Sequence, residues 1–109
     1  MTDNVIDRAV FDELLDAMGE EFATELVTTF FDEAPGMLAE LAEAAAKGAD
    51  EAFRRAAHSM KSNANVFGAE ALAARARAFE LEGLQAGTME EMRAEYARAE
   101  AALRELLDE

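Results

Sequence analysis

The chain contains a single histidine, His58, and the residue types that follow it suit phosphoryl chemistry. Lys61, Ser62 and Asn65 come three, four and seven positions later, which places all four side chains on one side of an α-helix. A neutral imidazole can act as a nucleophile near neutral pH, an ammonium can neutralise phosphoryl oxygens, and hydroxyl and amide groups can donate hydrogen bonds to them. Because phosphoryl transfer needs little beyond an in-line nucleophile and charge neutralisation, this set indicates a site that carries a phosphoryl group.

The segment around His58 has the pattern of an amphipathic helix over residues 50–67. Its apolar positions recur at steps of three and four residues: Phe53, Ala56, Ala57, Met60, Ala64 and Phe67. At 100° per residue, His58 falls about 140° from the centre of this stripe. We therefore expect its ring to lie in solvent, where the active site of a second protein can reach it.

The rest of the chain also reads as helix. The expected ranges are 7–18, 20–47, 69–84 and 88–108. Thr88 and Glu91 have the spacing of a capping box, which predicts a firm start for the last helix. Pro35 cannot donate to the carbonyl of Phe31, but the apolar pattern continues past it, which favours one bent helix over two. Residues 1–4 are expected to be loosely held.

Four long helices with short connections must run antiparallel to their sequence neighbours. We predict an all-α fold, namely an up-down antiparallel four-helix bundle with a short additional N-terminal helix and a proline kink in the first long helix. A chain of 109 residues fits one domain, taken here as 1–109. In the first long helix the expected inward positions are Phe22, Leu26, Phe30, Ala34, Leu38, Leu41 and Ala45.

Composition excludes several classes of function. The net charge of −14 argues against nucleic acid and anionic membranes as partners. The absence of cysteine removes disulfides and thiolate metal sites, and one histidine with scattered carboxylates gives no metal site, so we expect no metal and no cofactor. No nucleotide-binding glycine motif occurs, which argues against an autonomous kinase. The segment MTDNVIDRAV does not resemble a secretory signal, and no apolar run reaches the length of a membrane span, so we expect a cytoplasmic protein.

Positive charge is concentrated around the histidine. Five basic residues and one acidic residue lie between residues 52 and 79, while the rest of the chain is strongly acidic. Arginine is a good helix former, and that alone could explain the concentration. The other interpretation is a docking face for an acidic partner, or a field that stabilises a bound phosphoryl group. Arg54 and Arg55 are the candidates for such binding, together with Ser62 and Asn65.

The stretch AHSMKSNANVFGA at residues 57–69 resembles the histidine-containing phosphotransfer (HPt) domain family, whose pattern is A-H-x-[LM]-K-[GS]-x-[AS]-x-x-[LF]-G-A. A helix with the sequence FELE at residues 79–82 follows, as in that family. His58 matches the phosphorylated histidine and Lys61 the lysine one turn later. Glu80 occupies a position where the family often has glutamine or glutamate near the histidine, and Ser62 stands where many members have glycine.

The resemblance implies a four-helix bundle that accepts phosphate on His58 from a phospho-aspartyl receiver domain or a histidine kinase. It then passes the phosphate to the aspartate of another receiver. The implied partners are receiver domains of response regulators, hybrid histidine kinases or both, and family and size favour a monomer. Such a chain is a phosphohistidine intermediate carrier without its own ATP site, and whether it counts as an enzyme stays open.

Two alternatives remain open at this point. Glu80 could accept a hydrogen bond from the second ring nitrogen of His58 and fix its tautomer, or it could be a solvated helix charge. The whole chain could also be a helical adaptor bundle that binds a signalling partner and is never phosphorylated. Such an adaptor would not need Lys61 or the polar side of the helix around His58.

Overall fold

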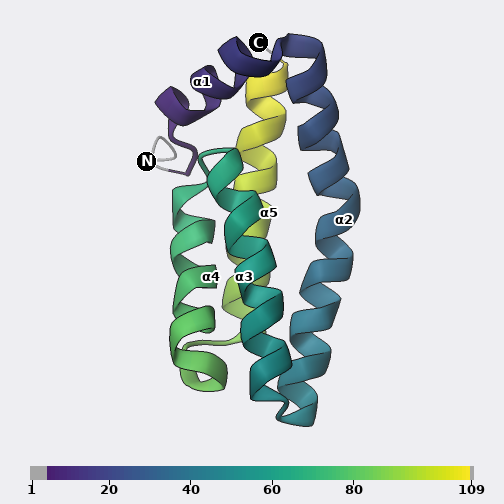
Figure 1. Ribbon diagram of the computed structural model, residues 1–109, viewed down its shortest axis with the longest axis vertical. Helices are drawn as coiled ribbons and strands as arrows, with labels where there is room; N and C mark the ends of the chain where they lie inside the picture. The colour runs from purple at the N-terminus through teal and green to yellow at the C-terminus, as the bar shows by residue number, and fades with distance from the viewer. Residues whose placement is uncertain (1–4, 109) are drawn as a thin grey trace.

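Helices account for nearly all of the part of the chain that the computed structural model describes, residues 5–108. The expectation for residues 1–4 lies outside this range. The elements are α1 (Arg8–Met18), α2 (Glu20–Lys47), α3 (Asp50–Val66), α4 (Glu70–Glu82), the short 3-10 helix η2 (Gly83–Gln85) and α5 (Met89–Leu107). Helices α2 to α5 run alternately up and down side by side, and α1 lies across one end (Figure 1). The predicted all-α bundle with an additional N-terminal helix is confirmed.

Side-chain caps mark the starts of α5 and α1. Thr88 is the N-cap of α5: its Oγ1 accepts from the Glu91 amide at 3.1 Å, and its own amide donates to Glu91 Oε1 at 2.9 Å. This is the predicted capping box, which satisfies two amides that have no partner inside the helix. At α1, the Asp7 carboxylate accepts from the Ala9 amide at 3.0 Å.

Helix α4 is shorter than the expected range of 69–84. It ends at Glu82 because Gly83 has a φ of +77°, a conformation that side chains with a Cβ rarely adopt. The chain then makes a single 3-10 turn before α5 begins. The range predicted from the sequence, which ends at residue 84, therefore extends two residues too far.

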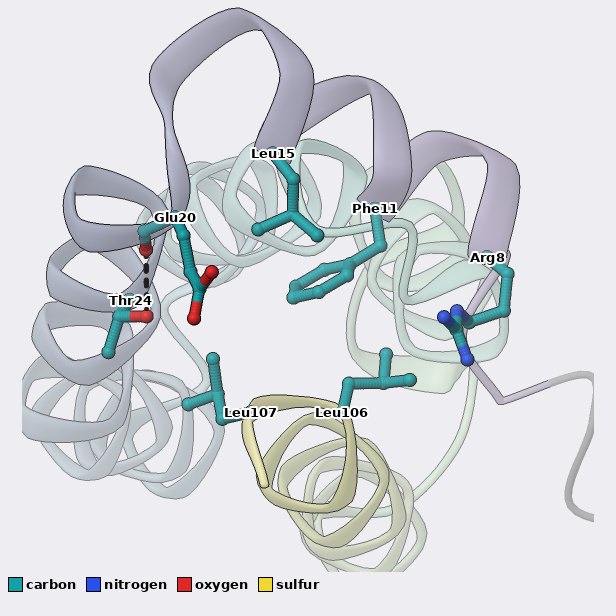
Figure 2. A pocket seen from close by; sticks show the side chains of 7 residues that line it. All are labelled: Arg8, Phe11, Leu15, Glu20, Thr24, Leu106 and Leu107. Carbon is teal, nitrogen blue, oxygen red and sulfur yellow. Dashed lines mark hydrogen bonds between the residues drawn. The ribbon is translucent and has the colours of Figure 1, made fainter. Parts of the chain in front are cut away.

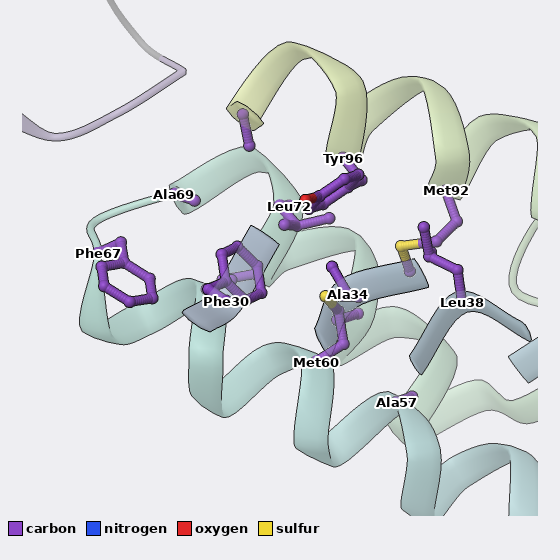
Figure 3. Packing of buried hydrophobic residues seen from close by; sticks show 14 of the residues in the cluster. Phe30, Ala34, Leu38, Ala57, Met60, Phe67, Ala69, Leu72, Met92 and Tyr96 are labelled. Carbon is purple, nitrogen blue, oxygen red and sulfur yellow. The ribbon is translucent and has the colours of Figure 1, made fainter. Parts of the chain in front are cut away.

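The core is a continuous apolar cluster between the four long helices (Figure 3). Phe30 of α2 stacks on Phe67 at the end of α3, with ring centroids 5.3 Å apart, and meets Tyr96 of α5 edge-on at 5.7 Å. The apolar stripe predicted for the histidine helix is buried in full: Phe53, Ala56, Ala57, Met60, Ala64 and Phe67. Helix α3 therefore has a fixed rotation about its axis, which determines where its polar residues point.

The predicted inward face of α2 is correct in the middle and wrong at its start. The four central positions are buried: Phe30, Ala34, Leu38 and Leu41. Phe22 is 48% exposed, and the neighbouring Ala23 is buried in its place. Counting back from Phe30 in steps of four residues drifts about 40° around the helix at each step, so the pattern loses its phase by Phe22. The helix runs through Pro35 as one element, which excludes two separate helices, and the kink stays a prediction.

Helix α1 is attached to the bundle through the turn between α3 and α4. The Asp7 amide donates to the Gly68 carbonyl at 2.7 Å. Beneath α1, a cavity of about 340 Å³ opens between α1, the start of α2 and the end of α5. Figure 2 shows Phe11, Leu15, Leu106 and Leu107 pointing into it, with Arg8 and Glu20 at its sides. No residue of α3 lines this cavity, so it is separate from the His58 region.

Candidate functional site

His58 lies in the middle of α3 and points away from the core. Its side chain is 58% exposed, while Ala57 and Met60 of the same helix are fully buried. This outward direction follows from the rotation that the apolar stripe imposes on α3. The ring is therefore anchored to a stiff element and remains accessible to a macromolecule.

One carboxylate joins His58 to Lys61. Glu80 of α4 places Oε2 at 2.7 Å from His58 Nδ1 and Oε1 at 2.6 Å from Lys61 Nζ. An ionised carboxylate can only accept hydrogen bonds, so in neutral His58 the proton resides on Nδ1. The lone pair of the ring is then on Nε2, the nitrogen on the far side from Glu80.

The charges around Glu80 favour its ionised form. The hydrogen bond from Lys61 is the largest influence and lowers the pKa of the Glu80 carboxyl, and the contact with His58 lowers it further, against an opposing effect of desolvation. At neutral pH the group that faces Nδ1 is thus an anion. It acts as an acceptor for the ring proton and as a counter-charge for any positive charge on the ring.

Lys61 is less exposed than its place on the predicted helix face suggests. Its side chain is 24% exposed, the same fraction as that of Glu80, because it reaches across to α4. Ser62 and Asn65 are both exposed on α3, as expected from their positions. The structure therefore brings His58, Lys61 and Glu80 into one contact network and leaves Ser62 and Asn65 on the open surface beside it.

Most of the chain, residues 25–109, matches a known protein family. The model of the Hpt domain matches residues 25–109, which begins within α2 and takes in α3, α4 and α5. The chain belongs to the Hpt domain family. Searches of curated proteins and of solved structures find no match. Membership in the family implies a phosphotransfer carrier of phosphorelays, and Hpt domains generally interact with receiver domains.

Two arginines precede the histidine of this Hpt domain, and they differ in their surroundings. Arg55 is 75% exposed and its nearest partner is Glu51, at 3.7 Å. Arg54 is engaged on three sides: its Nε donates to Asp50 Oδ2 at 2.7 Å, and its Nη1 donates to the carbonyl oxygens of Glu80 and Leu81 at 3.2 and 2.8 Å. The spacing of Asp50 and Arg54 signals the first contact, but nothing in the sequence indicates the two carbonyls of α4.

The positive charge around the histidine is largely paired within the domain. Arg75 of α4 approaches Glu91 at 3.7 Å and Glu95 at 3.4 Å, both on α5. Together with the pairs of Lys61 and Arg54, these contacts turn much of the basic stretch inward to neighbouring helices. Arg55 and Arg77 are exposed, so the described surface near His58 presents less positive charge than the sequence suggests.

Residues 5–108 lack two other features, a cluster of metal ligands and a membrane-spanning helix. No group of three or more His, Cys, Asp or Glu side chains there is arranged to hold a metal ion. Within the same range, no helix combines the length and apolar character needed to cross a bilayer.

Proposed function

We propose that His58 of this Hpt domain accepts a phosphoryl group on Nε2 from a phospho-aspartyl receiver domain or a histidine kinase and passes it to the aspartate of another receiver. The observation that carries the proposal is the pairing of an exposed ring with a carboxylate at its Nδ1. This pairing leaves Nε2 as the free nucleophile on the open side. We propose further that the domain works as a monomer in the cytoplasm.

The transfer from an aspartyl phosphate is balanced without other reactants. The Nε2 lone pair attacks phosphorus, the bond between phosphorus and the aspartate oxygen breaks, and the electron pair leaves with the aspartate carboxylate. The ring keeps its Nδ1 proton and becomes a cationic phosphoimidazole. In the onward step the Nε2–P bond breaks, its electron pair returns to the ring, and the next aspartate forms the new P–O bond.

Glu80 and Lys61 support both steps. The Glu80 carboxylate orients the ring through Nδ1 and offsets its positive charge once Nε2 is phosphorylated. Lys61 holds the second oxygen of Glu80 in the free domain, and its flexible ammonium can turn to the equatorial phosphoryl oxygens when they arrive. Ser62 and Asn65 can donate hydrogen bonds at the edge of the docking surface, and we assign Arg55 and the exposed part of Arg54 to contact with the acidic partner.

Covalent labelling tests this function. The protein is incubated with a panel of phosphorylated receiver domains and with histidine kinases from the same genome, and bound phosphate is followed over time. We expect a phosphate that is labile in acid and stable in alkali, and its loss in His58→Gln. Circular dichroism of that variant provides the control, since an exposed side chain contributes little to folding. A wild-type protein that stays unlabelled across the panel, yet binds one member, would favour the adaptor.

A further inference from the structure

Arg54 lies one helical turn before His58 on α3. It donates a hydrogen bond to the backbone carbonyl of Glu80, the residue whose side chain contacts His58. Glu80 belongs to the last turn of α4, since the helix stops at Glu82. The carbonyls of a last turn have no partner within their own helix, and such turns fray. A carboxylate on a frayed turn could not keep a 2.7 Å contact with an imidazole on another helix.

Two side chains of α3 complete the hydrogen bonds at this end of α4. In a helix that continued, the Leu84 amide would donate to the Glu80 carbonyl. Here the Leu84 amide lies 3.4 Å from Asp50 Oδ1, and the Glu80 carbonyl accepts from Arg54 Nη1 instead. The Asp50 carboxylate also binds Arg54 Nε at 2.7 Å and so fixes the guanidinium. We call Asp50, Arg54 and the carbonyls of Glu80 and Leu81 the arginine clamp.

The clamp fills the space beside Gly83. A Cβ at this position would lie against the Asp50 carboxylate and 2.7 Å from Arg54 Nη2. The positive φ of Gly83 and the absence of its side chain therefore both serve the close approach of the clamp. The fit indicates that the guanidinium occupies a defined place and is not a surface charge that happens to lie near α4.

We propose that Arg54 is a positioning residue for phosphotransfer: by holding the Glu80 backbone against α3, it keeps the Glu80 carboxylate on His58 Nδ1 and so keeps Nε2 free. Arg54 acts through Glu80 and does not itself touch the ring in this arrangement. The expected effect on the transfer rate rests on the proposed function. The effect of Arg54 on the His58 tautomer does not, because the tautomer can be measured without any phosphoryl transfer.

The test compares Arg54→Met with Arg93→Met, the same change at an exposed arginine of α5. The first readout is the tautomer of His58, taken from the ¹⁵N chemical shifts of the ring at a pH where it is neutral. The second is the rate at which phosphoramidate, a small phosphoryl donor that needs no docking surface, phosphorylates His58; the nitrogen attacks phosphorus and ammonia leaves. Arg54→Lys keeps the charge but presents one donor group in place of the planar fork.

We expect Arg54→Met to shift His58 from nearly all Nδ1–H to a mixture of tautomers and to slow its phosphorylation about tenfold, a modest loss for a displaced orienting group. Arg54→Lys should fall between these two, and Arg93→Met should match the wild type in both readouts. A folded Arg54→Met with the wild-type tautomer would overturn the proposal. If Arg54→Met loses helicity, Arg54→Lys takes its place in the test, and a wild-type tautomer in that variant would overturn the proposal.

The two proposals fail in different ways. A wild-type protein that is never phosphorylated by receivers or kinases contradicts the proposed function, while the tautomer measurement still decides the role of Arg54. Normal labelling of the wild type with an unchanged tautomer in both Arg54 variants contradicts only the clamp.

Discussion

At the scale of single residues, the proposed chemistry of this domain depends on the Glu80 carboxylate and its two neighbours. Glu80 accepts from His58 on one oxygen and pairs with Lys61 on the other. The proposed transfer needs both the oriented His58 ring and the Lys61 ammonium, because phosphoryl transfer requires a free nucleophile and charge neutralisation. The side chain that links them comes from a different helix, so the spacing of α4 from α3 is part of the site.

The ionisation of Glu80 predicts a specific pH dependence of stability. Its pKa in the folded domain lies below the ordinary value of 4.5, chiefly through Lys61. The stabilisation is therefore present above pH 4.5 and is lost as the pH falls through the lower folded value. We expect Glu80→Gln to be less stable than the wild type at pH 7, with a difference that shrinks toward zero in acid.

Urea unfolding at a series of pH values measures this difference. The matched control is Glu82→Gln, which changes an exposed carboxylate in the same turn of α4. A stability gap between Glu80→Gln and the wild type that is unchanged from pH 7 down to pH 3 would show that the Lys61 and His58 contacts do not stabilise the ionised carboxylate.

At the scale of the elements, the turn between α3 and α4 both ends α3 and holds α1 against the bundle. Gly68 has a φ of +75°, and a Cβ there would lie 2.8 Å from the Asp7 carbonyl and 3.0 Å from the Cβ of Val10. Glycine is therefore required at position 68 for two reasons: the backbone is left-handed there, and α1 approaches too closely for a Cβ. Gly48, between α2 and α3, has a φ of +66° but open space around it, so only the first reason applies there.

These two glycines give a matched pair of substitutions. We expect Gly48→Ala to cost about 1–2 kcal/mol of unfolding free energy, the usual cost of a left-handed residue with a Cβ. Gly68→Ala should cost about 1–3 kcal/mol more, since the backbone of α1 must also move. Urea unfolding gives both values, and limited proteolysis before α2 reports the release of α1. Equal losses in the two variants would mean that α1 is not held by its approach to Gly68.

At the scale of the whole molecule, the charges have two opposite effects on stability: the excess negative charge repels itself, and ion pairs attract neighbouring helices to one another. The 24 acidic and 10 basic residues leave a net charge of −14, while the ion pairs of Lys61 with Glu80 and of Arg75 with Glu95 join neighbouring helices. Excess charge of one sign destabilises a folded chain by self-repulsion, which salt screens at distances beyond about 8–10 Å. The short pairs lie well inside that distance and are screened less.

The balance predicts that salt stabilises the domain. We expect the midpoint of urea unfolding to rise when NaCl is increased from about 20 mM to about 150 mM, where the screening length falls to about 8 Å. Potassium chloride should give the same increase if the effect is screening and not the binding of a particular ion. A midpoint that falls with salt would mean that the ion pairs between helices outweigh the general repulsion.

The sequence alone determined the features that depend on local interactions. Apolar residues at helical spacing fixed the number of helices and the outward direction of His58, and the Thr88 capping box fixed the start of α5, because both depend only on residues within a few turns. Tertiary packing decided the rest. Whether Glu80 meets His58 or faces water, where Lys61 reaches, and what Arg54 holds all depend on the distance between α3 and α4. That distance is set by side chains of the whole core, and no local pattern encodes it.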